Sequence, residues 1–174
     1  MNHAEKEEIV KKALSSVSAA LAHAQSLVSS PGENGNPGDG VQRPGKTAAS
    51  LLLPASPSGG VAAATEGSTQ REYASALRCR LEIQYALLLI QKGLSIEIEM
   101  APPAAPSSRS AQKARLAAGV KSDLEGALSA LESGSPEGAG AKLAAADSKA
   151  AQLISKIRGE LKQYARVRRQ NRDR

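Results

Sequence analysis

Apolar positions in the first part of the chain recur with the period of an α-helix. Between about Ala4 and Val28 the spacing alternates between four and three residues, along Val10, Leu14, Val17, Leu21, Ala24 and Val28. This heptad pattern presents a narrow apolar stripe to another helix. Further apolar residues widen the stripe, so packing inside a bundle and pairing in a coiled coil both fit the pattern.

A second helical pattern runs from Thr69 to Gly93. Thr69 suits the N-cap, Glu72 follows three positions later, and Gly93 suits the C-terminal end. The pattern has two apolar faces, one with Leu77, Leu81 and Leu88 and the other with Ile83, Leu87 and Ile90. A helix that is apolar around most of its circumference is typical of the centre of a bundle, so we expect this helix to be the core element.

The residues after this helix alternate between apolar and polar from Leu94 to Met100. A period of two is typical of a strand, but no second strand is evident to pair with it. We therefore favour an extended segment, followed by a stiff proline-rich connector at 101–108.

Two further helices are predicted at about 110–132 and 137–168, separated by a break at Ser133–Pro136. Gly134 suits the C′ position of the first and Pro136 the first turn of the second, and so short a break makes the two helices antiparallel neighbours. The region 29–68 is rich in Gly, Pro, Ser and Asn and predicts a disordered linker. The fold class expected is an all-α four-helix bundle with this long insert between the first two helices. The domains are an N-terminal helix at 1–28, the linker at 29–68, a helical domain at 69–168 and a basic tail at 169–174.

The composition supports helices and gives little sign of catalysis. With three Tyr and no Phe or Trp, the core must consist of aliphatic side chains and Ala, which favours close-packed helices. Cys79 is the single cysteine, which excludes an internal disulfide and fits a reducing compartment, so we expect a cytoplasmic or nuclear protein. One cysteine with His3 and His23 makes no usual zinc site, so we expect no metal. Because the sequence also offers no catalytic constellation, we expect no cofactor and no enzymatic activity. The longest apolar run, Tyr85–Ile90, is too short to span a membrane.

One motif suggests nucleotide binding. Residues 40–47 match the P-loop pattern G-x-x-x-x-G-K-[ST], in which Lys46 would reach phosphate oxygens and Thr47 would bind Mg²⁺. A P-loop needs a buried strand before it and a full helix after it. Neither is predicted here, because 31–39 is rich in Gly and Pro, and Pro54 would end any helix that follows. We therefore favour a coincidental match, and nucleotide binding stays a distant third hypothesis behind the two given below.

The charge distribution is the clearest functional signal. The net charge of +6 resides in the last nineteen residues, and the chain before Lys156 is neutral. Arginines suited to binding phosphate continue past the last apolar positions, at Arg166, Arg168, Arg169, Arg172 and Arg174. They predict contact with an acidic partner or with a nucleic-acid backbone; cations that merely complement the helix dipole are the alternative explanation.

Two hypotheses for the function follow. The first is a non-enzymatic helical interaction protein, an adaptor or subunit of a larger assembly. Protein contact or self-association would use the heptad stripe of Val10, Leu14, Val17 and Leu21, and the basic tail would contact an acidic partner. The alternative is a nucleic-acid-associated factor, such as an RNA-processing or ribosome-assembly component, that binds phosphate through the C-terminal arginines. No membrane partner is expected, because the tail lacks apolar anchors.

Overall fold

The computed structural model describes residues 3–29, 60–100 and 111–172. These residues form four long helices and one π-helical turn, and none of them is in a β-strand. The elements are α1 at His3–Ser29, α2 at Gly60–Leu88, the turn η1 at Leu89–Gly93, α3 at Ala111–Glu132 and α4 at Pro136–Arg172. The prediction of an all-α bundle is confirmed.

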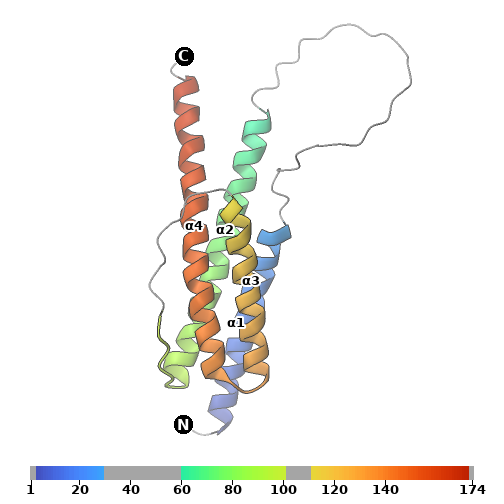
Figure 1. Ribbon diagram of the computed structural model, residues 1–174, viewed down its shortest axis with the longest axis vertical. Coiled ribbons are helices and arrows are strands. Elements are labelled where there is room, and N and C mark those ends of the chain that lie inside the picture. The colour runs from blue at the N-terminus through green and yellow to red at the C-terminus, as the bar shows by residue number, and fades with distance from the viewer. Residues whose placement is uncertain (1–2, 30–59, 101–110, 173–174) are drawn as a thin grey trace, which may run out of the picture.

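Each helix packs mainly against two neighbours, in the cyclic order α1, α2, α4, α3. As Figure 1 shows, α1 and α4 run in one direction and α2 and α3 in the other, so all neighbouring helices are antiparallel. The parallel helices α2 and α3 lie diagonally across the bundle. α2 and α4 are the longest helices, and at one end of the molecule they project beyond α1 and α3 (Figure 1).

The break between α3 and α4 follows the sequence prediction. Gly134 has a φ of 75°, the left-handed conformation that favours glycine. The Ser135 N–H donates to the Ala130 carbonyl at 2.8 Å, and the Gly134 N–H donates to the Leu131 carbonyl at 3.1 Å. This is the Schellman arrangement at a helix C-terminus, and it reverses the chain within three residues.

The core is built from aliphatic side chains of all four helices and from many alanines. Ile83, Ile90, Leu124, Leu143, Leu153 and Ile157 are the largest fully buried aliphatic side chains. Buried alanines such as Ala20, Ala86 and Ala146 lie between them. A small side chain at these positions lets the helices approach closely, which compensates for the lack of aromatic bulk.

Two predictions about α2 are wrong. The helix begins at Gly60, nine residues before the predicted start, and Thr69 is a buried residue inside it rather than its N-cap. The Thr69 hydroxyl donates to the carbonyl of Thr65 at 3.0 Å, so it bonds within the helix. The stretch 60–64 contains three alanines, whose high helix propensity favours the earlier start. The helix is also not enclosed on all sides, since Leu81 on its first apolar face is 64% exposed.

Residues 95–100 belong to no helix or strand of the described chain. Leu94, the first residue of the predicted extended segment, keeps helical backbone angles, with a φ of −102° and a ψ of −3°. Ser95, with a φ of 57°, turns the chain away from η1. Ile96 and Ile98 then pack against the core. Ile98 lies over Gly140 of α4 so closely that a Cβ atom on Gly140 would overlap with Ile98 Cδ1. An alanine at this position would therefore force the Ile98 side chain to move.

Several predictions fall outside the described residues. These are the P-loop match at 40–47, the linker prediction for residues 30–59 and the proline-rich connector at 101–108.

Candidate interaction surfaces

The heptad stripe predicted for partner contact packs against the protein's own core. Val17 is fully buried, and Val10, Leu14 and Leu21 are half-buried against the same core cluster. The structure does bring these four residues together on one side of α1, but that side faces α2 and α3. In this arrangement the stripe stabilises the bundle.

A different apolar stripe lies on the outside of α2. Leu77, Leu81, Tyr85 and Leu88 follow one another at intervals of four, four and three residues, so they share one face of the helix. They are 38%, 64%, 49% and 51% exposed, respectively. We call these four residues the α2 apolar stripe. A contiguous set of large exposed apolar side chains is uncommon on a monomeric surface and is typical of an interaction site.

Polar contacts on either side of this stripe hold α2 in its orientation. On the α4 side, Arg80 donates from Nε to Asp147 Oδ1 at 2.9 Å and from Nη2 to Oδ2 at 3.4 Å. On the α1 side, the Ser16 hydroxyl donates to the Glu82 carboxylate, and Cys79 Sγ lies 3.4 Å from the Ala20 carbonyl. Desolvation by burial raises the pKa of the Cys79 thiol to about 12, so this cysteine is an inert core residue and no nucleophile.

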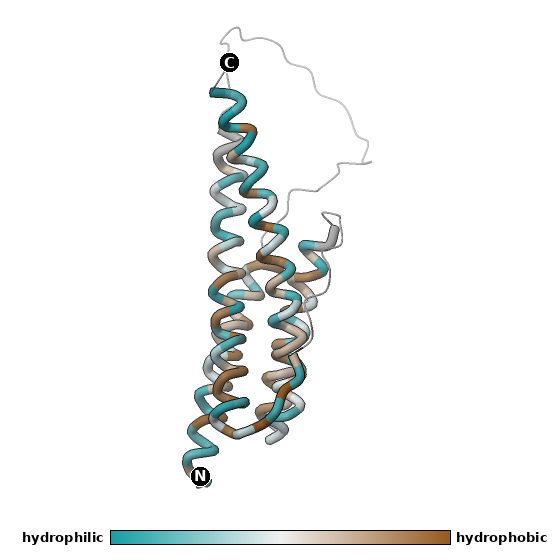
Figure 2. Tube along the Cα trace, turned by 90° about the vertical axis from the view of Figure 1, so that its left-hand side faces the viewer, coloured by the Kyte–Doolittle hydropathy of each residue, from teal (hydrophilic) through white to brown (hydrophobic). Residues whose placement is uncertain are grey.

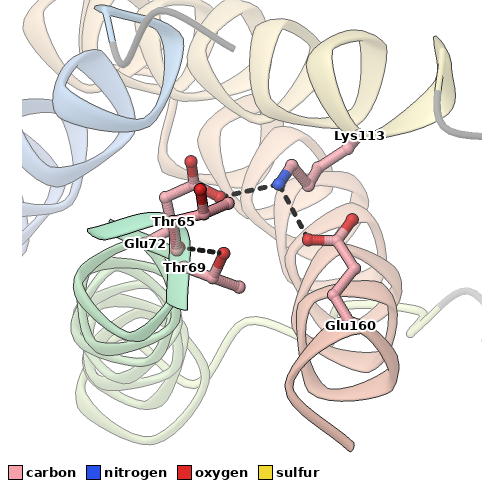
Figure 3. Close-up of polar contacts among 5 residues, drawn as sticks. All are labelled: Thr65, Thr69, Glu72, Lys113 and Glu160. Atoms are coloured by element: carbon pink, nitrogen blue, oxygen red, sulfur yellow. Dashed lines mark hydrogen bonds and ion pairs between the residues drawn. The ribbon is translucent and has the colours of Figure 1, made fainter. Parts of the chain in front are cut away.

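A polar cluster joins α2, α3 and α4 near the end where α2 and α4 project. Lys113 Nζ lies 2.8 Å from Glu72 Oε2 and 3.0 Å from Glu160 Oε2, as Figure 3 shows. Burial lowers the pKa of Lys113, but hydrogen bonds to the two carboxylates outweigh this effect and leave the pKa raised. The adjacent apolar cavity has a volume of about 110 Å³, which is far below the roughly 300 Å³ typical of the smallest ligand pockets. The cluster is therefore a structural clamp between three helices.

The C-terminal cations are part of α4, which continues as a helix to Arg172. Arg166, Arg169 and Arg172 are exposed. Arg168 differs, because its Nη2 lies 2.6 Å from Glu66 Oε1 of α2 and this pair ties the two projecting helices together. Arg174 lies outside the described residues.

No group of three or more His, Cys, Asp or Glu side chains that could hold a metal ion occurs in the described part of the chain. Within the same residues, no helix combines the length and the apolar character needed to cross a membrane.

Comparison with known proteins gave no relative. No protein-family model matches the chain, and neither the curated proteins nor the solved structures contain a significant match.

Sequence reasoning listed Leu77, Leu81 and Leu88 correctly as one face but assigned that face to the interior. It did not include Tyr85 with them, although Tyr85 follows Leu81 by one helical turn. Two polar residues beside the stripe, Arg78 and Gln84, could have indicated that this face of α2 is exposed, and both are exposed in the structure.

Proposed function

We propose that the protein is a non-enzymatic helical interaction module that binds a protein partner through the α2 apolar stripe. The observation that carries this proposal is the line of four large, exposed apolar side chains on a helix whose opposite face is fully buried. Ile83 and Leu87, on the buried face of α2, are between 0% and 3% exposed. The α2 apolar stripe is therefore not part of the hydrophobic core of the bundle.

The energy available at the stripe is enough to support a specific contact. Full burial of a large apolar side chain contributes about 1.5–3 kcal/mol. Each residue of the stripe still exposes about half of its surface, so covering it would add roughly 1 kcal/mol, and the four together about 4 kcal/mol. A central apolar group of this size, surrounded by polar residues, is the usual composition of an interface hot spot.

The charges around the stripe favour an acidic partner helix over a second copy of this chain. Arg71 and Arg78 are the exposed charged residues of α2. All three carboxylates of α2 are already engaged, Glu66 by Arg168, Glu72 by Lys113 and Glu82 by Ser16. A second copy would bring further cations to this positive rim, whereas an amphipathic helix with acidic residues beside its apolar face would complement it.

The experiment is site-specific photo-crosslinking in cells, with the photoreactive residue at Leu81 or, as the control, at the exposed Ser122 of α3. We expect a discrete crosslinked partner from Leu81 and none from Ser122. The double variant Leu77→Gln/Leu88→Gln should abolish the crosslink. The matched variant Val28→Gln/Val167→Gln, which removes two isolated exposed valines elsewhere, should leave it unchanged.

Two results would overturn the proposal. One is a Leu81 product that contains only a second copy of this chain, which would make the stripe a self-association surface. The other is a partner that is captured equally well by the Leu77→Gln/Leu88→Gln variant, since this outcome would place the binding site elsewhere.

A further inference from the structure

Five cations share one side of α4 near its C-terminus. They are Arg158, Lys162, Arg166, Arg169 and Arg172, at successive intervals of four, four, three and three residues. Residues at these intervals are neighbours on a helix surface. All five are exposed, and none forms an ion pair with another residue that the structure describes. We call these five residues the α4 cationic face.

The remaining charges of this part of α4 point elsewhere. Glu160, the one acidic residue between 158 and 172, reaches to Lys113 of α3. Arg168 lies about a quarter turn or more from the centre of the cationic face and pairs with Glu66. Within residues 158–172 the face is consequently free of acidic side chains, so no carboxylate of this stretch offsets its positive charge.

The position of this face makes it accessible to a large ligand. It spans residues 158–172, which corresponds to about 21 Å of helix at 1.5 Å per residue. Lys113, near the start of α3, is level with Glu160, so most of the face belongs to the part of α4 that extends beyond α3 (Figure 1). Figure 2 shows that this projecting end is mostly hydrophilic.

We infer that the α4 cationic face binds the phosphate backbone of a double-stranded nucleic acid. Four of the five cations are arginines, whose planar guanidinium groups bind two phosphate oxygens at once. A duplex carries a negative charge about every 1.7 Å along its axis, so a straight row of cations can contact several phosphates together.

The chemistry of the face favours nucleic acid over the other anionic ligands. Protein interfaces have an apolar centre from which charged residues are depleted, whereas protein–DNA interfaces are strongly positive. Val167, the exposed large apolar residue of this stretch, lies on the other side of the helix from Lys162 and Arg169. Without apolar side chains the face lacks anchors for a membrane, and without aromatic residues it lacks platforms for stacking single-stranded bases. This inference is independent of the α2 apolar stripe.

The test is fluorescence anisotropy with labelled duplex DNA and duplex RNA of the same sequence, over a series of KCl concentrations. The face variant carries Arg158→Gln, Lys162→Gln, Arg166→Gln and Arg169→Gln. The control variant loses the same net charge elsewhere, through Lys6→Gln, Lys11→Gln, Lys12→Gln and Lys92→Gln. Gln has a helix propensity similar to that of Arg and Lys, so we expect both variants to keep the wild-type helical circular dichroism.

Wild type should bind at least one duplex with a steep salt dependence, and the two arms identify which duplex is preferred. Each phosphate contact contributes about 0.9 to the slope of log K against log[salt], so losing four contacts should reduce the slope by roughly 3 to 4 and weaken binding at low salt at least about tenfold. The control variant should keep most of the slope and affinity.

Equal weakening in the two variants would overturn the inference, because it would assign binding to net charge rather than to this face. Wild-type protein that binds neither duplex but sediments with vesicles containing phosphatidylserine would also overturn it. So would a face variant with the wild-type salt slope on both duplexes.

Discussion

The ion pair between Arg80 of α2 and Asp147 of α4 should respond very differently to the loss of either partner. The Asp147 side chain is 9% exposed, whereas that of Arg80 is 35% exposed. Replacing Arg80 by Met leaves a buried carboxylate without its cation, a change that costs about 3–5 kcal/mol in fully buried pairs. Because water reaches this pair from the arginine side, we expect a smaller loss, about 2–3 kcal/mol of unfolding free energy.

Replacing Asp147 by Asn should be milder. The guanidinium group of Arg80 is already partly solvated and can turn outwards, so we expect a loss of about 1 kcal/mol. The double variant Arg80→Met/Asp147→Leu removes both charges and keeps much of the apolar volume. We expect it to be within about 1 kcal/mol of wild type.

Urea unfolding followed by circular dichroism at the helical minimum gives each free energy, with Arg78→Met as the control. Arg78 is two residues from Arg80 but exposed, so its loss should change stability by less than about 0.5 kcal/mol. A thermal melt should show the same order, with roughly 2–4 °C for each kcal/mol. If Asp147→Asn costs more than Arg80→Met, or if Arg80→Met behaves like Arg78→Met, the argument from unequal burial is wrong.

Three further predictions concern other parts of the bundle. Gly159→Ala should stabilise the fold by up to about 1 kcal/mol in thermal melts, because no atom lies within 4 Å of the added Cβ. Gly140→Ala should instead destabilise it by roughly 1–3 kcal/mol, because the added Cβ would collide with the Ile98 side chain. Lys113→Met should lower the free energy of unfolding at neutral pH. The pKa of Lys113 is raised above 10.5 in the folded protein, so the stabilisation from its ion pairs is complete below pH 10.5 and is lost as the pH rises through the folded pKa. The unfolding free energies of wild type and variant, measured by urea titration, should therefore converge in strong alkali. Leu81→Gln should change the urea midpoint little, within about 0.5 kcal/mol, while Ile83→Ala should cost about 2–4 kcal/mol, and equal costs would contradict the outward orientation of the α2 apolar stripe.

The positions of the helices were largely predictable because the patterns that specify them are local. The Leu143 to Leu161 series on α4 repeats with helical spacing, and the glycine at 134 has the conformation that the break requires. The start of α2 was missed because Thr69 resembles an N-cap in sequence, whereas in the structure its hydroxyl bonds to the Thr65 carbonyl one turn earlier.

The surfaces were harder to predict because apolar spacing does not say which face of a helix is covered. Leu81 and Ile83 are both aliphatic and two positions apart, yet only Ile83 is inside, since α1 and α4 flank α2 and leave its outer side open. Similarly, the sequence places Arg168 among equivalent arginines. Its pairing with Glu66, about a hundred residues away in the chain, depends on the antiparallel packing of α2 and α4.

The alkylation rate of Cys79, the single cysteine of the chain, would report whether α1 detaches from the bundle. Cys79 is 1% exposed beneath α1, and a pKa of about 12 leaves almost no thiolate at neutral pH. A ligand that binds the buried apolar stripe of α1, which includes Val17, would have to displace α1 from the bundle. This displacement would expose the sulfur of Cys79. Alkylation by iodoacetamide would then accelerate when such a ligand is added, whereas a ligand held on the outer side of α2 would leave the rate as slow as in the resting protein.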